Sequence, residues 1–506
     1  MERRALLAVV LSIVVLIVYS YFLQPKPVQR QIGKEKPKPE VAKETPILLP
    51  KLPLLDGAGE DVIVETDMYK AILTTKGATI KSWELKNYKD RNGMPVQLLK
   101  EQGAIPPLAI LLEGVNRDLP QKIIYHTNTD RLILTGRGGS KGEVVFTYNS
   151  QGMFIRKKLV FYNDDYRADL SIETVNTPPY LLSLGTDFGI FDKKDDAHKG
   201  PVVLIDSDRK EFDEALKEPR HLTGNIYWIA QEDKYFVSAI VPRTGVLGAT
   251  IWKEGNSAEI GLKLSPERQE LLLYAGAKEY DRLKALKVKL EHVIDFGWFS
   301  IVAMPLFWVL KFFYKFIGNY GWAIVLLTII IRIPFIPLIN KSGRSMKKMQ
   351  EIQPKMAEIK EKYKKDPKKM QKEMMELYKK HKVNPMGGCL PILLQIPVFI
   401  ALYNVLSKAI ELRGAPFILW IKDLSARDPY YILPIVMGLT MVIQQKMTPS
   451  GMDPMQAKIM MILPIVFTFL FLTFPSGLVL YWLVNNALGI IQQYYINQKL
   501  EVRSEK

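Results

Sequence analysis

The sequence predicts a polytopic α-helical membrane protein that carries a large all-β domain outside the cytoplasm. Of its 506 residues 48% are hydrophobic, but the apolar runs crowd into residues 5–23 and 297–495, and the middle has the composition of a soluble protein. The clustered lysines and arginines behind the net charge of +17 lie beside the apolar runs. This distribution is typical of positive-inside orientation and contact with anionic lipids rather than of nucleic-acid binding. Cys389 is the single cysteine, which excludes an intrachain disulfide.

The first apolar run predicts an N-terminal transmembrane anchor over residues 1–23. Arg3 and Arg4 precede a continuous apolar stretch that is about long enough to cross the hydrocarbon. A cleaved signal peptide is the alternative, but the run is long for one and no small-residue cleavage site follows it. We therefore expect a retained anchor with a cytoplasmic N-terminus, followed by an extended linker rich in proline and lysine over residues 24–57.

Residues 58–296 are predicted to form the extracytoplasmic domain. Short runs of β-branched and aliphatic residues alternate with turn signals such as Asn92-Gly93. Because no helical segments separate these runs, we expect an antiparallel β-sandwich. A charged amphipathic helix over residues 278–293 is expected to lead back to the membrane. The predicted strands include residues 62–64, 71–73, 132–134, 144–146, 202–205, 235–241 and 271–274.

Residues 297–317 are expected to form an amphipathic helix that lies in the membrane interface. The segment is rich in aromatic residues, Pro305 interrupts it, and its two charges, Lys311 and Lys315, share one helical face. Aromatic rings and snorkelling lysines favour the boundary between hydrocarbon and water. This segment is therefore not counted as a span.

Five further spans are predicted within residues 318–497. Together with the anchor they make six, which returns the tail, residues 498–506, to the cytoplasm. The loop 340–383 has a large excess of lysine over acidic residues and belongs inside, whereas residues 474–476 carry no charge and suit the outside. The predicted spans are residues 320–339, 387–409, 430–447, 456–473 and 477–495.

The basic loop is predicted to fold into a cytoplasmic antiparallel helical hairpin over residues 341–383. Apolar residues recur at spacings of three and four, and Asp366-Pro367 is a typical start of a second helix. Many of the apolar residues are methionines, among them Met370 and Met374. Two interpretations stay open: these methionines pack the helices together, or they offer an adaptable surface that captures substrate segments.

Arg332 lies deep in the second predicted span, where insertion of an arginine costs roughly 2.5–3.5 kcal/mol. None of the five C-terminal spans contains Asp, Glu or His, so the charge has no ionic partner there. We expect an aqueous cavity around it, and the alternative is a structural anchor bonded to backbone carbonyls. Polar side chains that could line such a cavity are Thr328, Gln395, Tyr403, Asn404, Gln444, Gln445, Tyr481, Asn485 and Asn486.

The types of residue present in the sequence, and the absence of Asp, Glu and His from the five C-terminal spans, argue against several classes of function. Ion-coupled transporters normally carry intramembrane carboxylates or histidines, and Ser476 has no histidine in any span to act as the base of a protease. Asp195, Asp196 and His198 form only a weak metal-ligating pattern, and no phosphate-binding loop is present. The sequence therefore predicts no enzyme activity, no metal site and no cofactor.

Four segments in the C-terminal part form a recognisable pattern. They read NPMGGCLP at 384–391, QIPVF at 395–399, DPYYILP at 428–434 and FPSGLVLYW at 474–482. In this order, with Arg332 ahead of them, they resemble the YidC-type membrane-protein insertases over roughly residues 297–500. The anchor and β-domain resemble the Gram-negative form of that family, whose periplasmic domain is a β-supersandwich similar to sugar-mutarotase folds.

The resemblance implies a five-span insertase core that inserts and folds membrane proteins, alone or with the Sec translocon. Its groove would be hydrophilic, open to cytoplasm and lipid, and closed outside. Carried onto this sequence, the groove arginine is Arg332 and its neighbour Thr328, a groove amide is Gln444, and the substrate contacts include Phe399, Tyr481 and Trp482. Gln395 and Asn485 join the candidate groove as polar side chains of the neighbouring spans.

The implied location is the bacterial inner membrane, with both termini cytoplasmic and the β-domain in the periplasm. The implied partners are nascent membrane proteins, the Sec translocon, anionic lipids, and the ribosome and signal-recognition machinery at the cytoplasmic face, with no nucleic-acid substrate. A solute transporter is one alternative, although it lacks coupling residues. Another is a membrane-anchored carbohydrate-binding or mutarotase-like periplasmic protein, which would need a convergent acid and base in the β-domain.

Overall fold

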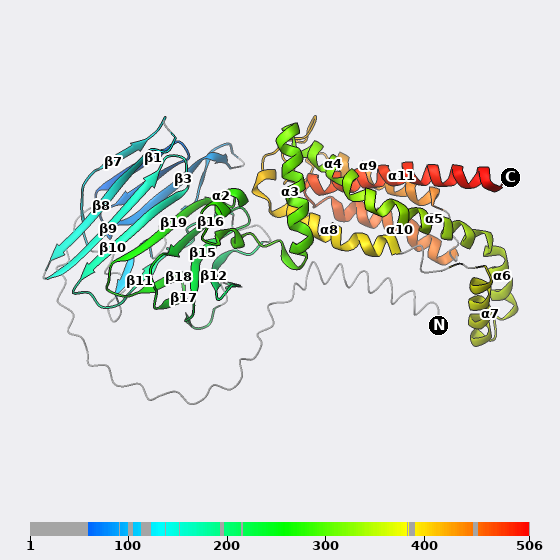
Figure 1. Ribbon diagram of the computed structural model, residues 1–506, viewed down its shortest axis with the longest axis horizontal. Helices are drawn as coiled ribbons and strands as arrows, with labels where there is room; N and C mark the ends of the chain where they lie inside the picture. Colours follow the sequence, from blue (N-terminus) through cyan, green and yellow to red (C-terminus); the bar gives the residue numbers. More distant parts are fainter. Residues whose placement is uncertain are drawn as a thin grey trace, which may run out of the picture. The chain divides into compact units, whose positions relative to one another are not determined.

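The computed structural model describes residues 59–504 apart from 91, 100–104, 113–122, 137, 151, 193–196, 214–215, 382, 384–389 and 449–453. The predicted anchor and linker, residues 1–57, lie outside the described residues, as does Cys389. The chain divides into a small unit around residues 340–388 and a larger unit that holds the strands and the other helices (Figure 1).

The strands of the described residues form three sheets (Figure 1). The first has the order β4-β3-β2-β1-β7, with β1 Asp61–Thr66, β2 Tyr69–Thr74, β3 Thr79–Lys89, β4 Pro95–Gln97 and β7 Arg131–Leu134. The second has the order β13-β12-β15-β16-β19-β10-β9-β8-β6, with β6 His126–Thr127, β8 Lys141–Ser150, β9 Met153–Tyr162, β10 Arg167–Val175, β12 Gly200–Ile205, β13 Asp208–Glu211, β15 Ile226–Glu232, β16 Phe236–Pro242 and β19 Gln269–Ala277. The third has the order β14-β17-β18-β11-β5, with β5 Ile110–Leu112, β11 Tyr180–Ser183, β14 Arg220–Leu222, β17 Gly248–Glu254 and β18 Ser257–Leu264.

All seven segments predicted as strands overlap strands of these sheets. The expectation of purely antiparallel pairing is wrong at one place, because β1 and β7 run parallel, in register from Ile63↔Arg131 to Thr66↔Leu134. A tight hairpin cannot join parallel strands. The long connection from β1 to β7 passes through other strands of the domain and makes this pairing possible.

Strand β9 illustrates how the sequence builds the domain core. Its side chains alternate between buried and half-exposed along the whole strand, as a strand with one face on the core requires. The buried face includes Lys157, which is fully buried and whose ammonium group donates to the carbonyls of Gly77, Ala78 and Leu108 at 2.9, 3.1 and 2.7 Å. Burial lowers the pKa of Lys157 to about 7. The three carbonyl acceptors explain why this polar residue is tolerated inside.

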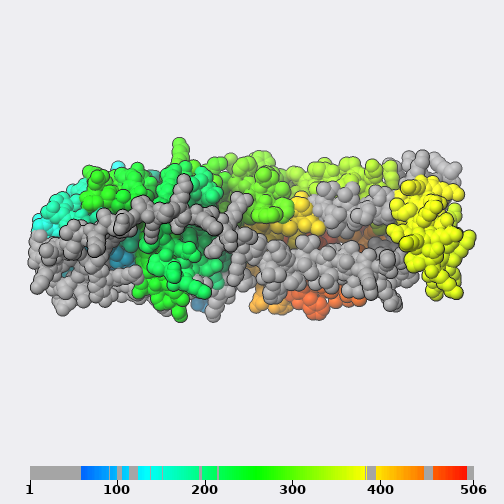
Figure 2. Space-filling view, turned by 90° about the horizontal axis from the view of Figure 1, so that it is seen from below, coloured from blue at the N-terminus to red at the C-terminus, as the bar shows by residue number. Residues whose placement is uncertain are grey.

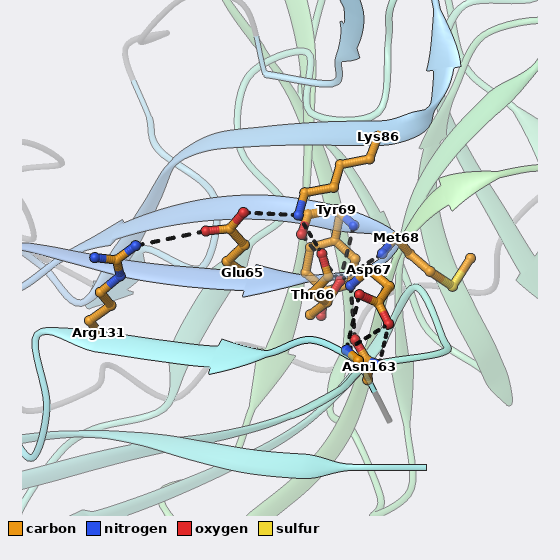
Figure 3. A network of polar contacts seen from close by, with 9 residues as sticks. Glu65, Thr66, Asp67, Met68, Tyr69, Lys86, Arg131 and Asn163 are labelled. Atoms are coloured by element: carbon orange, nitrogen blue, oxygen red, sulfur yellow. Dashed lines mark hydrogen bonds and ion pairs between the residues drawn. The ribbon is translucent and has the colours of Figure 1, made fainter. Parts of the chain in front are cut away.

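A polar network fastens the first sheet to the turn between β9 and β10 (Figure 3). The carboxylate of Asp67 accepts from Asn163 Nδ2 at 2.7 Å, and Asn163 Oδ1 accepts from the Asp67 amide at 2.8 Å. Lys86 bonds Glu65 at 3.0 Å and the Thr66 carbonyl at 2.6 Å. The bonds between Asp67 and Asn163 join segments that are 96 residues apart in sequence.

The helix predicted over residues 278–293 is wrong in its extent. The structure has a short helix, α2 Tyr280–Ala285, and a separate 3₁₀ turn, Leu290–Val293. Lys287 and Lys289 between them have left-handed backbones, with φ of 57° and 60°, a conformation that ends a helix. Trp228 Nε1 donates to the Lys289 carbonyl at 3.0 Å, so packing on the β-domain overrides the helical pattern.

The remaining helices lie in the C-terminal half of the chain (Figure 1). They are α3 Ser300–Ile317, α4 Tyr320–Arg332, α5 Ile336–Glu351, α6 Gln353–Lys362, α7 Pro367–Lys380, α8 Leu390–Lys408, α9 Ile432–Met447, α10 Pro454–Phe471 and α11 Ser476–Ser504. A 3₁₀ turn at Ile333–Phe335 joins α4 to α5, since Pro334 and Pro337 cannot donate the backbone bonds of a regular helix. Four of the five segments predicted as C-terminal spans overlap one helix each, and the segment 320–339 covers α4, the 3₁₀ turn and the start of α5.

Among the described residues, two stretches are long and apolar enough to cross a membrane by length and composition, Gly297–Ile317 and Tyr320–Glu351. Helix α9 and part of α10 are apolar but shorter. The interfacial placement of residues 297–317 therefore stays a prediction. Large apolar side chains remain exposed on the outer faces of α9 and α10, as expected for helices that face lipid; examples are Leu439, Ile443, Ile462, Ile465 and Phe469.

The small unit is a helical hairpin whose side chains gather in one compact block (yellow in Figure 2). Asp366 caps α7, as predicted, because its side chain accepts from the Lys369 amide at 3.1 Å. The first hairpin helix is not continuous, since α5 ends at Glu351 and α6 begins after Ile352 with a proline in its first turn. The seam buries Ile352 and Met356 together with Val383.

Candidate functional site

Arg332 ends α4 and lies among polar groups of α11. Its Nη1 donates to the carbonyl and the side-chain oxygen of Asn485 at 3.0 and 2.7 Å, and its Nη2 donates to Gln492 Oε1 at 3.2 Å. Among the described residues, Nε of Arg332 has no acceptor. All three hydrogen bonds therefore go to uncharged oxygens, and the charge keeps unused donor capacity.

A glycine allows these groups to converge. A Cβ at Gly489 would lie 2.6 Å from Gln444 Nε2 and 3.2 Å from Arg332 Nη2, so a larger residue would push both side chains away. Helices α9 and α11 thus supply Gln444, Asn485 and Gln492 around one guanidinium. The sequence predicted the first two, whereas Gln492 was missed because it lies near the end of its predicted span.

The other polar candidates are arranged differently. Thr328 is 1% exposed, and its hydroxyl donates to the Ile324 carbonyl one turn earlier at 2.7 Å, so it does not bond Arg332. The side chain of Gln395 on α8 reaches the hydroxyl of Tyr481 on α11. Tyr481 is itself buried. Gln395 and Tyr481 thus form a polar contact between α8 and α11, and α11 also carries Asn485.

The predicted substrate contacts Phe399 and Trp482 touch each other. Their ring centroids are 4.9 Å apart with the planes at 87°, a favourable edge-to-face geometry. Phe467 and Phe471 of α10 extend the cluster, with centroids 5.6 and 5.2 Å from that of Trp482. The indole Nε1 of Trp482 is buried and has no acceptor among the described residues. Helices α8, α10 and α11 therefore meet in an aromatic cluster.

Asp428 is a structurally important residue for which no role was predicted from the sequence. It is 1% exposed, and its carboxylate accepts from Trp420 Nε1 at 3.0 Å, from the Tyr430 amide at 3.0 Å and from the Leu433 amide at 2.7 Å. It thus caps the start of α9 and fixes the connection between α8 and α9. The DP dipeptide followed by an apolar run was the available signal.

The same connection is bonded to the turn between α10 and α11. The amide and the hydroxyl of Ser476 both donate to the Ala426 carbonyl, at 2.7 and 2.8 Å, and the Gly477 amide donates to the Leu424 carbonyl at 2.9 Å. Ser476 is therefore a structural turn residue, which agrees with the interpretation that it is not a nucleophile.

The hairpin methionines differ in their surroundings. Met374 packs against the hairpin seam, whereas Met370 is half-buried and lies outside that cluster. Met375, for which no role was predicted, is 49% exposed. The hairpin therefore uses some of its methionines for packing and leaves others at the surface.

The described residues contain no group of three or more His, Cys, Asp or Glu side chains that could hold a metal ion. His198 lies 3.8 Å from Glu211 and 3.9 Å from Asp213. Asp195 and Asp196 of the weak pattern lie outside the described residues.

Comparison with known proteins identifies the family to which this chain belongs. The model of the YidC periplasmic domain matches residues 61–309, and that of the 60Kd inner membrane protein matches residues 312–504. A membrane protein insertase YidC from Geotalea daltonii is 42% identical, over 99% of this chain and 100% of its own length. The chain belongs to the YidC family. It is thus a membrane-protein insertase of the inner membrane, not an enzyme, and its β-domain is the periplasmic domain.

A second full-length relative agrees with this assignment to the YidC family, and two solved structures show weaker likeness. The insertase of Geotalea uraniireducens is 43% identical, over 99% of this chain and 100% of its own length. A crystal structure of an active YidC insertase with its first transmembrane domain resolved is 20% identical, covers 87% of this chain and 93% of its own, and has a TM-score of 0.39. A galactose mutarotase related enzyme from Lactobacillus acidophilus covers 42% of this chain and 97% of its own at 11% identity, with a TM-score of 0.27. The full-length relatives favour neither the transporter nor the carbohydrate-binding alternative.

Proposed function

We propose that the insertase lowers the barrier for moving a short polar tail of a client through the bilayer, and that Arg332 attracts acidic residues of that tail. The observation that carries the proposal is the bonding of Arg332 to uncharged oxygens alone, at Asn485 and Gln492. A client carboxylate would replace a neutral acceptor by a charged one, and charge-assisted hydrogen bonds are roughly twice as strong.

The size of the effect is sufficient for catalysis of insertion. At an effective dielectric constant near 20, opposite charges about 4 Å apart attract by about 4 kcal/mol before desolvation. A net gain of only about 1.4 kcal/mol in the transition state would speed passage roughly tenfold. Water around the guanidinium would shorten the hydrocarbon path that the tail must cross.

Apolar client segments take a different path in this proposal. They contact Phe399 and Trp482 and move into lipid between α8 and α11. The hairpin captures clients first, through Met370 and Met374, and the exposure of Met375 adds a further apolar contact. Gln395, Gln444 and Tyr481 supply hydrogen bonds to the polar part of the client, beside Thr328.

We infer that the hairpin and both termini lie in the cytoplasm. The lysines of the hairpin would then contact anionic lipids. The hairpin would also face the ribosome, the signal-recognition machinery and the Sec translocon. Labelling of single cysteines in a Cys389→Ser background tests the orientation. Lys365→Cys should react only from inside and Lys422→Cys, in the connection between α8 and α9, only from outside; the reverse pattern would overturn it.

The experiment on Arg332 compares one client with an acidic tail and with a neutralised tail. Arg332→Lys should keep much of the insertion activity because the charge remains, although the planar fork is lost. Arg332→Ala should slow the acidic tail about tenfold more than the neutral one. Arg344→Ala is the matched control, since it removes an exposed arginine twelve residues later in the same helical stretch. Equal defects for both tails would show that Arg332 is only structural.

A further inference from the structure

An open cavity of about 700 Å³ lies outside the groove, between α2, the polar side of α3, the start of α4 and the connection after α8. The two family matches meet between residues 309 and 312. Trp308, Lys311 and Phe312 line the cavity at this point. The cavity therefore lies where the match to the periplasmic domain ends and the match to the membrane domain begins.

One carboxylate in the cavity, that of Glu411, is only weakly paired with a cation. Glu279 accepts from Tyr88 at 2.8 Å and from Arg282 at 3.1 Å, and Asp281 bonds Lys311. Glu411 is only 15% exposed, and its ion pair with Lys311 is loose at 3.8 Å. Burial raises the pKa of Glu411 to about 7, as expected for a carboxylate without a close cation.

The cavity also contains a lysine, Lys315, whose ammonium group forms no ion pair among the described residues. Lys315 follows Lys311 by one helical turn and lines the same cavity. It is exposed and forms no ion pair with any residue that the structure describes. The cavity thus presents a carboxylate with only a loose ion pair, that of Glu411, and an exposed ammonium group, that of Lys315, with no ion pair among the described residues.

The rest of the wall is aromatic and opens onto an apolar surface. Tyr314 and Tyr320 stack with centroids 3.8 Å apart and planes at 6°. Trp308 is 51% exposed, and Phe312 and Phe316 are 58% and 71% exposed. Ring faces attract ammonium groups, and exposed phenylalanines favour contact with acyl chains.

We propose that this cavity binds a phospholipid whose head group carries a primary amine beside its phosphate. The amine donates to Glu411 against the faces of the tyrosine pair, the phosphate pairs with Lys315 and Lys311, and the acyl chains cover Phe312. Each unused group in the cavity then gains a partner of opposite charge.

The charges discriminate between head groups. Three carboxylates and two lysines line the cavity, so a head group with only negative charge would meet uncompensated repulsion at Glu411. A trimethylated amine keeps the positive charge but cannot donate a hydrogen bond to the carboxylate. Free phosphate would satisfy the lysines alone and would leave Glu411 and the rings without a partner.

The test uses the full-length insertase in nanodiscs that contain equal amounts of phosphatidylethanolamine, phosphatidylcholine and phosphatidylglycerol with the same acyl chains. A photoreactive phenylalanine analogue replaces Phe312, and mass spectrometry identifies the adducts. We expect ethanolamine lipid to give about threefold more adducts than either of the other two lipids. Glu411→Gln should reduce this preference, and Lys315→Gln should reduce total lipid capture because all three lipids carry the phosphate. Glu358→Gln on the exposed face of α6 should change neither.

Lys315 is exposed, so its variant separates loss of binding from loss of folding. Capture in proportion to the lipid mixture would overturn the proposal. So would an ethanolamine preference that survives Glu411→Gln, or lipid capture that survives Lys315→Gln. Adducts that are mainly polypeptide would also overturn it and would identify the cavity as a protein-docking site.

Discussion

Replacement of Asp428 by asparagine should weaken the helical core. Asp428 is buried and accepts three N–H groups, from Trp420, Tyr430 and Leu433. The amide oxygen of an asparagine can serve the donors on one side, but its NH₂ group then faces an N–H on the other side. One charge-assisted bond is lost, worth about 1.5–3 kcal/mol, and the two that remain become neutral and weaker. We expect Asp428→Asn to lower the free energy of unfolding by roughly 2–4 kcal/mol.

The matched control is Asp423→Asn in the same connection. Asp423 is half-exposed and accepts from the amide and the hydroxyl of Ser425 at 2.8 and 2.7 Å. Water can satisfy an asparagine there, so its cost should stay within about 0.5 kcal/mol. The measurement is the free energy of unfolding in mixed micelles, followed by tryptophan fluorescence during titration with SDS. If the two variants are equally stable, the carboxylate of Asp428 does not hold this connection and the reasoning is wrong.

Two further predictions concern the periplasmic domain and the helix packing. Burial raises the pKa of Glu259 to about 8, above that of an unfolded glutamate at about 4.3. Its contribution to stability is therefore complete below about pH 4 and lost as the pH rises to about 8, and Glu259→Gln should flatten this fall in the thermal unfolding midpoint; an unchanged pH profile would refute it. A Cβ at Gly438 would lie 2.0 Å from Thr468 Oγ1, so Gly438→Ala should separate α9 from α10 and cost roughly 1–3 kcal/mol. Gly138, whose Cβ position is open, is the control, and equal stability of the two alanine variants in micelles would contradict the packing argument.

Much of the fold could be predicted because its signals are local. The alternation along β9 and the N-cap at Asp366 each depend on residues within a few positions of one another. The apolar runs, likewise, are read directly from the order of residues. Where a distant segment competes with the local pattern, the prediction fails: the helix expected over residues 278–293 breaks because Lys289 bonds Trp228 of the β-domain.

The candidate site could be predicted only in part. That Arg332 lacks an acidic partner follows from composition alone, since the C-terminal spans contain no Asp or Glu. Which groups replace that partner does not follow, because Asn485 and Gln492 are 153 and 160 residues away in the chain. The role of Phe399 and Trp482 as substrate contacts was predicted from a family resemblance. Their contact with each other is visible only in the tertiary structure.

The sequence by itself determined which segments are apolar, which alternate and where charge is confined, because hydropathy and backbone preference act over one helical turn or one strand. Only the tertiary structure decided which buried polar groups find partners. Lys157 at three carbonyls, Asp428 at three N–H groups and Glu411 loosely paired with Lys311 all look alike in sequence, as charged residues near apolar ones. Their roles differ because hydrogen bonding and desolvation depend on atoms brought together by the whole fold.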